Sequence, residues 1–308
     1  MANIITRPDW YIPESEVTPE NIYRNRRKFL KEMGFVGAST LNAQSLAANE
    51  SKLYPAKRNG LFSPPLHITP SKYALNYNNF YEFSTDKDEV VELAASFRTS
   101  PWNVKAGGLC DKPIEFDPVE MAREIGLEER VYRFRCVEAW GMVVPWTGFP
   151  LNKLLRKLKP KSDAKYVKFA TALKPDEMPG IAKLRRYPWP YTEGLRMDEA
   201  MHDLTMVVTG IYGKPLPNQN GAPIRIVVPW KYGYKSIKSI DTIELTDKQP
   251  ATLWETVNPT EYPFESNVDP KVSHPRWSQA RHRDLETGLR VPTMYLNGYA
   301  KEVRSLYR

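Results

Sequence analysis

The sequence predicts an α+β fold with mixed β-sheets, a few peripheral helices and long irregular loops. Its 308 residues include 8 Trp, 17 Tyr and 27 Pro but only 16 Gly. Aromatic residues favour strands and prolines favour ordered loops, so this composition argues against a helical bundle. No GxGxxG or GxxxxGK[ST] pattern occurs, which argues against a glycine-rich nucleotide fold. With 41% hydrophobic residues the chain can bury a large core.

The first 48 residues differ from the rest of the chain and predict a leader. A basic run at 24–31 (RNRRKFLK) is followed by an uncharged stretch at 33–48, and Arg26-Arg27 precedes Phe29-Leu30. This order is typical of a twin-arginine export signal. The alternative is a basic amphipathic helix on the protein surface. We therefore expect a leader at 1–48 and one domain at 49–308. Because this pathway carries folded proteins, we also expect a cofactor to be inserted before export.

The elements of the domain follow from local patterns. Residues 61–69 are a proline-rich linker, and 102–116 read as a strand pair that turns at Gly107-Gly108. Asp117-Pro118 predicts the start of a helix over 119–125. The remaining expectations are a helix at 150–158, strands at 166–173 and 204–211, a long functional loop at 175–191, and an irregular tail from 250 that wraps the body.

Cys136 is the residue on which the chemistry most plausibly depends. The chain has only two cysteines, Cys110 and Cys136, and Cys136 ends an apolar strand pattern. Alternation puts Phe134 and Cys136 on one face and Arg135 on the other, so the arginine cannot pair with the sulfur. Such a thiol keeps a high pKa and is inert unless a soft metal binds it. An inert core cysteine is the alternative, and it is also our expectation for Cys110.

Two further segments can form a ligand site. In 78–83 (NNFYEF), amides and a carboxylate alternate with aromatic residues, which suits the wall of a polar heterocycle site; a turn with ordinary core aromatics is the alternative. Arg225 lies in an apolar run and needs an anionic partner. With Asn220 and the three lysines and one serine of 231–238 it predicts a phosphate cradle, the alternative being a solvated hairpin.

Several function classes are excluded. The net charge of +8 is scattered without a long basic block, so we expect no nucleic acid partner, and a bound anion explains the charge more simply. The four histidines form no HExxH motif and no CxxC pair occurs, which argues against a zinc enzyme. No GxSxG motif supports serine hydrolysis.

Taken together, six segments strongly resemble the molybdenum-containing protein-methionine-sulfoxide reductase catalytic subunits, a family with the sulfite oxidase fold. The resemblance covers essentially the whole chain, and its blocks are specific only in combination. They are 78–83 (NNFYEF), 133–140 (RFRCVEAW), 219–223 (QNGAP), 230–238 (WKYGYKSIK), 297–300 (NGYA) and 305–308 (SLYR).

The resemblance implies a molybdenum–molybdopterin cofactor in which the Cys136 thiolate binds the metal beside a pterin dithiolene. It also implies that nine residues hold the pterin and its phosphate: Asn78, Tyr81, Glu82, Thr171, Asn220, Arg225, Ser236, Ile237 and Lys238. Ser236 departs from the glycine that the family pattern has there, and serine restricts φ where glycine does not. The chain ends soon after the pterin domain, so we expect a monomeric catalytic subunit.

The activity implied is reduction of methionine sulfoxide residues in exported proteins, by oxygen-atom transfer to molybdenum in the periplasm. Electrons would come from a membrane haem-binding subunit fed by quinones. We expect an open site, with Trp140, Trp189 and Trp277 as candidates to line it. Two alternatives stay open: a sulfite-oxidising enzyme, whose site would be rimmed by several arginines, and a cofactor-free binding module.

Overall fold

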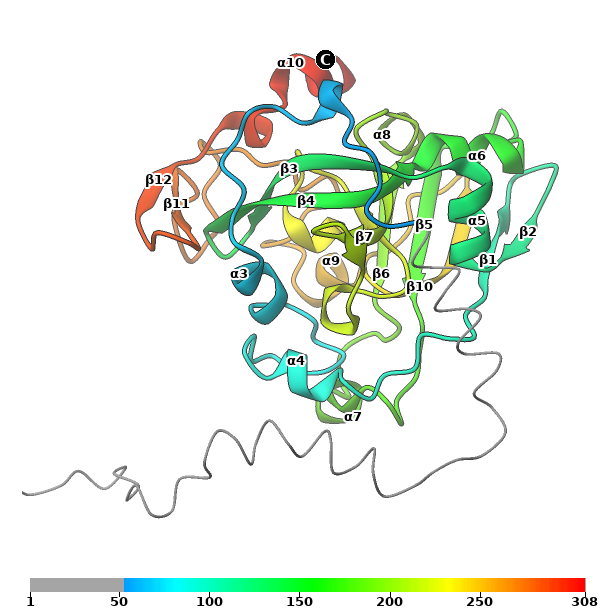
Figure 1. The fold of residues 1–308 in the computed structure, drawn as a ribbon, viewed down its shortest axis with the longest axis horizontal. Helices are drawn as coiled ribbons and strands as arrows, with labels where there is room; N and C mark the ends of the chain where they lie inside the picture. Colours follow the sequence, from blue (N-terminus) through cyan, green and yellow to red (C-terminus); the bar gives the residue numbers. More distant parts are fainter. Residues whose placement is uncertain (1–52, 308) are drawn as a thin grey trace, which may run out of the picture. The chain divides into compact units, whose positions relative to one another are not determined.

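A computed structural model describes residues 53–307. They form two β-sheets surrounded by short helices and joined by long loops (Figure 1), which confirms the predicted α+β class. The predicted leader at 1–48 lies outside the described residues, so the export signal and the domain boundary stay predictions. No helix within 53–307 has the length and apolar character needed to cross a bilayer.

The first sheet has five strands in the order β2-β1-β10-β5-β6. Its strands are β1 (Val104–Gly108), β2 (Ile114–Phe116), β5 (Tyr166–Thr171), β6 (Thr192–Arg196) and β10 (Ile240–Thr246). β1 runs parallel to β10, and the other pairs are antiparallel. Because both kinds of pairing occur, this sheet is mixed as predicted.

The second sheet has seven strands and is built on a long hairpin. Its strands are β3 (Glu128–Cys136), β4 (Trp140–Pro150), β7 (Met206–Ile211), β8 (Lys214–Pro215), β9 (Arg225–Val227), β11 (Arg281–Asp284) and β12 (Arg290–Pro292). Figure 1 shows β3 and β4 crossing the middle of the molecule, with β11 and β12 at one end. β11 pairs parallel with β4, so this sheet is also mixed.

The helices are short and peripheral. They are α3 (Ser71–Asn76), α4 (Val90–Leu93), α5 (Pro118–Ile125), α6 (Leu151–Leu158), α7 (Pro179–Lys183), α8 (Met197–Ala200), α9 (Leu253–Val257) and α10 (Ala300–Val303), with 3-10 turns η2 (Gly60–Phe62), η3 (Asn218–Asn220), η4 (Gly233–Lys235), η5 (Tyr295–Gly298) and η6 (Arg304–Tyr307). The predicted helices at 119–125 and 150–158 are confirmed. Asp117 caps α5 by accepting from the Val119 and Glu120 amides, as Asp-Pro at a helix start predicts.

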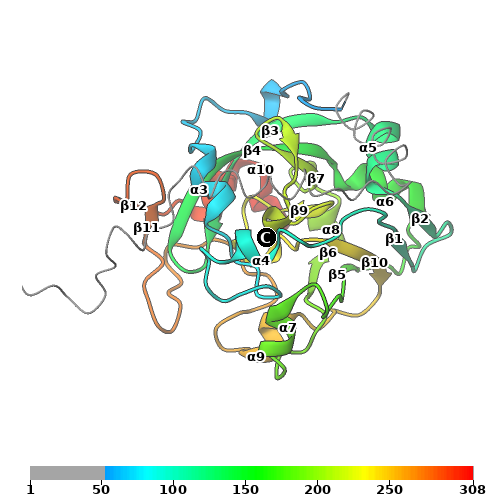
Figure 2. The same cartoon turned by 60° about the horizontal axis from the view of Figure 1, so that its bottom comes forward.

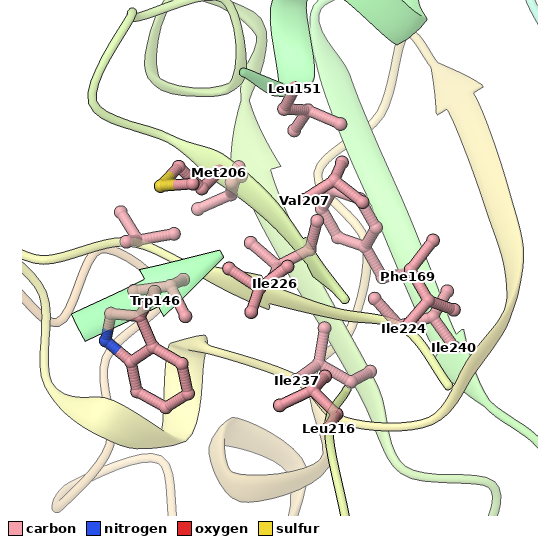
Figure 3. Packing of buried hydrophobic residues seen from close by; sticks show 14 of the residues in the cluster. Trp146, Leu151, Phe169, Met206, Val207, Leu216, Ile224, Ile226, Ile237 and Ile240 are labelled. Carbon is pink, nitrogen blue, oxygen red and sulfur yellow. The ribbon is translucent and has the colours of Figure 1, made fainter. Parts of the chain in front are cut away.

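α6 shows why an amphipathic octamer is stable here. Leu151, Leu154, Leu155 and Leu158 recur at helical spacing and are fully buried. Burying each leucine contributes about 1.5–3 kcal/mol. Figure 3 shows Leu151 in the core beside Met206 and Val207 of β7, while Phe169 of β5 and Ile240 of β10 lie near Ile224, which directly precedes β9. The core therefore joins residues of both sheets.

The predicted turn at Gly107-Gly108 is wrong. Both glycines end β1 and pair with Glu244 and Leu245 of β10, and the chain turns between 108 and 114 instead. A Cβ on Gly108 would lie 2.2 Å from the Leu245 carbonyl oxygen, and φ there is +87°. Glycine is needed for this close approach between strands and does not mark the hairpin turn.

The loop at 175–191 and the tail from 250 contain more regular structure than expected. The loop includes α7, and the tail includes α9, β11, β12 and α10. Figure 2 shows α7 close to α9, and the Tyr187 and Trp254 rings meet edge-to-face with centroids 5.9 Å apart. Gly180 of α7 donates its amide to the Glu82 carbonyl at 2.8 Å. The loop therefore supports the chain segment after α3.

Candidate active site

One cavity collects the predicted site residues. It lies between the end of the β3–β4 hairpin, the segment that follows α3, and the chain leading into β10. All ten residues named from the sequence line it: Asn78, Tyr81, Glu82, Cys136, Thr171, Asn220, Arg225, Ser236, Ile237 and Lys238. Residues up to 160 positions apart in the chain are thus brought together at one site, and their individual roles stay predictions.

Cys136 is the last residue of β3, at the tip of the hairpin. It pairs with Trp140 across a three-residue turn that closes with Ala139 at φ 61°. As alternation predicts, Phe134 and Cys136 line the cavity and Arg135 does not. Burial and the Glu138 carboxylate raise the pKa of the Cys136 thiol. Without a metal this thiol stays protonated and unreactive, whereas a soft metal ion can displace its proton.

A small polar cluster borders the sulfur. The Asn79 amide nitrogen lies 3.5 Å from Sγ of Cys136 and donates to the Glu138 carboxylate at 3.0 Å. Trp140 Nε1 donates to the same carboxylate at 3.0 Å, and Lys87 forms an ion pair with it at 3.2 Å. Burial acts to raise the pKa of Glu138, but these partners outweigh it and hold the pKa below its usual value. The sulfur therefore faces a fixed carboxylate.

Asn78 and Asn220 present acceptors to the cavity. Each donates its side-chain nitrogen to the Ala74 carbonyl of α3, at 3.0 and 2.9 Å. Their Oδ1 atoms, and Oδ1 of Asn79, are buried and have no hydrogen-bond partner within residues 53–307. A buried acceptor without a partner is costly. Three such acceptors at one cavity suit a ligand rich in N–H groups.

Arg225 and Lys238 form the basic end of the cavity. Arg225 donates to the carbonyls of Asn220 and Ser236, at 2.9 and 2.8 Å, and Lys238 donates to the Asn79 carbonyl. Neither has a carboxylate within ion-pair distance in the described part of the chain. Burial lowers the pKa of Arg225 to about 9, and burial together with the Arg225 charge lowers that of Lys238 to about 7. A buried arginine and a half-buried lysine without an ion-paired carboxylate favour a bound anion.

Backbone amides add to this anion site. The N–H groups of Ile237 and Lys238 donate no hydrogen bond to any residue in 53–307. Gly221 allows the Lys238 side chain to pack against the backbone of residue 221. A Cβ there would lie 2.7 Å from the Lys238 side chain, and φ is +98°. Adjacent free amides beside two cations are the donors that a phosphate binds.

Ser236 occupies its position without backbone strain. Its φ is −94°, so the glycine expected from the family pattern is not required here. Its hydroxyl accepts the Val228 amide at 3.1 Å, and its carbonyl accepts Arg225. The serine thus joins the Arg225 strand to the segment that carries the free amides.

The remaining predicted residues form the wall between the two ends of the cavity. Burial raises the pKa of Glu82 to about 7, against the nearby Lys238 charge. The Thr171 hydroxyl donates to the Lys238 carbonyl at 2.8 Å. The Tyr81 ring meets Trp254 edge-to-face with centroids 5.1 Å apart. Polar groups and aromatic faces thus alternate along the wall.

Two predictions about this site are wrong. Lys231 and Lys235 do not join the cradle, because they form buried ion pairs with Glu199 and Glu193, both at 2.6 Å. Trp189 and Trp277 do not line the cavity, although Trp140 does. The two lysines and Trp277 are held by partners from distant parts of the chain, whereas Trp189 is held locally by the Leu184 carbonyl and the Tyr187 ring.

Other lining residues were missed from the sequence: Asn79, Glu138, Trp146, Tyr191, Trp254 and Tyr262. Asn79 directly follows Asn78, and Glu138 lies two residues after Cys136. This closeness in sequence to predicted site residues could have identified both. Trp146 belongs to both the core and the cavity (Figure 3), and its buried Nε1 has no acceptor among residues 53–307. Nothing in its local sequence distinguishes it from a core tryptophan.

The lining fits the cofactor that the resemblance implies. The orphaned amide oxygens suit the N–H groups of a pterin, the basic end suits its phosphate, and the soft sulfur donor suits molybdenum. Only one arginine, Arg225, is among the lining residues of this cavity. The arginine rim expected of a sulfite-oxidising site is therefore not found there.

Comparisons with known proteins agree with this site. A family model described as oxidoreductase molybdopterin binding domain matches residues 91–254. The protein-methionine-sulfoxide reductase catalytic subunit MsrP of Xanthomonas axonopodis pv. citri is 47% identical over 306 residues, covering 96% of this chain and 95% of that protein. The protein of the same name from Campylobacter jejuni is 51% identical over 294 residues, covering 95% and 97%.

Among solved structures, the sulfane dehydrogenase SoxCD from Paracoccus pantotrophus matches with a TM-score of 0.47 and 16% identity. The match covers 85% of this chain and 65% of that chain. The assignment rests on the family model and the two relatives, which confirm the resemblance seen in the sequence. The chain belongs to the family of protein-methionine-sulfoxide reductase catalytic subunits, which are oxidoreductases, and its domain binds a molybdenum–molybdopterin cofactor.

Proposed function

We propose that this chain reduces methionine sulfoxide residues in exported proteins of the periplasm, with electrons from a membrane haem-binding subunit, and that it works as a monomeric catalytic subunit. The observation that carries the proposal is a single cavity that combines the Cys136 thiol, partnerless amide oxygens and two cations without carboxylates. The relatives named above bear the same activity in their names. The twin-arginine pattern at 24–31 supports export.

The chain's own residues would hold the cofactor at both ends. Cys136 would bind the metal, Asn78 and Asn220 would accept from the pterin, and Arg225 and Lys238 would bind the phosphate. When bound, the cofactor would supply the two-electron chemistry that removes the oxygen atom of a sulfoxide. The net reaction consumes two electrons and two protons and yields methionine and water, so an external electron donor must reduce the cofactor after each turnover.

The side of the cavity near Cys136 suits the substrate. Tyr81 and Trp254 are half-exposed, and their rings form an apolar wall for the methylene and methyl groups of a methionine side chain. The Glu138 carboxylate, held by Asn79, Trp140 and Lys87, keeps a fixed polar surface beside the sulfur. These residues would orient the side chain, while burial of Cys136 limits access of water.

The test is turnover by the purified cofactor-loaded chain with reduced benzyl viologen as electron donor. We expect the wild type to reduce methionine sulfoxide in an oxidised unfolded protein, and Cys136→Ser to be inactive. Sulfite with an electron acceptor is the control substrate. Turnover of sulfite without sulfoxide reduction would overturn the proposal, and so would wild-type activity in Cys136→Ser.

A further inference from the structure

A second buried arginine, Arg135, lies directly beside the cysteine ligand and plays no part in the site described above. It is only 1% exposed, yet it has no carboxylate within ion-pair distance among residues 53–307. Its guanidinium donates to the Cys136 carbonyl, to the Gln279 side-chain oxygen at 2.6 Å and to the Thr293 hydroxyl at 3.3 Å. A buried charge satisfied only by neutral groups is rare and costly.

Arg135 is not a cofactor or substrate ligand. It points to the opposite face of β3 from Cys136 and is absent from the lining of the cavity. Arg225, in contrast, lines the cavity, where an anion can neutralise it. Arg135 therefore lies outside the set of residues that would hold the cofactor.

The charge acts on its surroundings. Burial and the Arg135 guanidinium lower the pKa of His282 on β11 to about 4. Burial raises the pKa of Tyr232, and Arg135 is the largest influence opposing that rise. The guanidinium lies over the Tyr232 ring, 5.6 Å from its centroid. Because the interior screens charge weakly, the same field reaches the neighbouring Cys136.

The tail holds this arrangement in place. Trp277 and Gln279 both donate to the Val137 carbonyl, at 2.8 and 2.7 Å, and the Arg283 amide donates to the Ala139 carbonyl at 2.8 Å. Each of these carbonyls belongs to the hairpin turn that follows Cys136. The Gln279 side chain therefore connects the turn to Arg135: its amide nitrogen donates to the Val137 carbonyl, and its amide oxygen accepts from Arg135.

We propose that Arg135 is a positioning residue that fixes the Cys136 carbonyl and whose uncompensated positive charge makes reduction of the bound molybdenum easier. The inference rests on the proposed function, in which Cys136 binds the metal. Adding an electron increases the negative charge of the site, and a nearby fixed cation stabilises that state. Surroundings beyond the direct ligands are known to set the potentials of metal sites in this way.

The test is a redox titration of purified cofactor-loaded protein, followed by the paramagnetic resonance signal of the intermediate molybdenum state. Arg135→Gln removes the charge and keeps a hydrogen-bond donor. We expect its one-electron reduction equilibrium to weaken about tenfold, which corresponds to about 59 mV. Arg135→Lys should keep the wild-type potential. Arg133→Gln removes a charge two residues earlier on the same face of β3 and should not change the potential.

A second variant keeps the arginine. Gln279→Glu retains the acceptor for Arg135 and adds a negative charge next to it, while Trp277 still donates to the Val137 carbonyl. We expect a decrease in potential in the same direction as for Arg135→Gln. If Arg135→Gln fails to retain molybdenum, the potential of Gln279→Glu still tests the effect of the Arg135 charge.

An unchanged potential in Gln279→Glu overturns the inference, as does an equal shift in Arg133→Gln. Failure of the proposed function has a different signature. In that case the wild type contains no molybdenum, or its resonance signal is the same in Cys136→Ser.

Discussion

Four basic residues lie within one stretch of fourteen, yet they fall into two contrasting pairs. Lys231 and Lys235 are buried against Glu199 and Glu193, with both partners of each ion pair at most 1% exposed. Arg225 is also buried and Lys238 is half-buried, but their neighbours are carbonyls and the cavity. The first pair is neutralised by carboxylates of the protein, whereas the second pair is available to bind an anion.

This difference separates structural cations from binding cations. Glu199 also accepts the Tyr307 hydroxyl at 2.7 Å, and Lys231 also donates to Asn267 at 2.9 Å, so that ion pair is fully surrounded by partners. Arg225 and Lys238 impose a desolvation cost that only a ligand relieves. Substitution in the first pair should therefore reduce mainly stability, and substitution in the second pair mainly cofactor binding.

The largest effect is expected from Lys231→Met. The substitution leaves the Glu199 carboxylate buried without its cation, which costs about 3–5 kcal/mol of unfolding free energy. Urea unfolding of the chain would measure the loss. Lys168→Met is the matched control, because the Lys168–Glu244 pair is 39% and 47% exposed and should cost less than about 1 kcal/mol.

If Lys231→Met does not fold, the double variant Lys231→Met with Glu199→Gln should restore folding, because the unpaired charge is then absent. Stability of Lys231→Met within about 1 kcal/mol of wild type would contradict a structural role for this lysine.

A smaller effect on stability is expected from Lys238→Met. The cofactor-free chain should lose less than about 1 kcal/mol of stability, since an unneutralised charge is removed together with one hydrogen bond. Cofactor affinity should fall roughly tenfold to a hundredfold, because a charge-assisted bond to phosphate is lost. The pterin released by dialysis measures retention. Full retention, or destabilisation as large as in Lys231→Met, would break the contrast between the pairs.

The mildest test uses pH. The pKa of Lys238 is lowered to about 7 from 10.5 and that of Glu82 is raised to about 7 from 4.5. As pH rises through 7, the folded cofactor-free chain therefore loses a positive charge and gains a negative one. Sulfate, which stays ionised, should then stabilise it less, with affinity falling up to about tenfold per pH unit for each proton lost.

Thermal unfolding with and without sulfate at constant ionic strength measures this effect. Without sulfate, Lys238 adds stability as pH rises from 7 towards 10.5, because only the unfolded chain then binds its proton. Lys238→Met should remove this part of the pH dependence. A sulfate effect that grows with pH would contradict a cationic end of the cavity.

Local sequence patterns predicted much of the fold and part of the site. Alternation placed Cys136 and Arg135 on opposite faces of a strand, and capping placed α5, because these signals act within a few residues. Local patterns could not predict which lysines form buried ion pairs and which line the cavity. Lys231, Lys235 and Lys238 look alike locally, and the carboxylates that distinguish them come from β6 and α8.

The same limit applies to the tail and to the roles of the site residues. Gln279 contacts the Cys136 hairpin although the two are more than 130 residues apart in the sequence, and local periodicity does not predict such a contact. Trp254 lines the cavity and Trp277 does not, although both lie in the same proline-rich tail. The family resemblance named the ten site residues, and the fold explains why they meet.

The most direct test of the central claim is metal and pterin analysis of the purified chain, wild type against Cys136→Ser. Given one soft protein ligand, the wild type should contain about one molybdenum and one pterin per chain, and the variant should lose the metal. Cys110→Ser, which replaces the other cysteine, should keep it. A wild type without molybdenum, or a Cys136→Ser variant that retains it fully, would contradict the account.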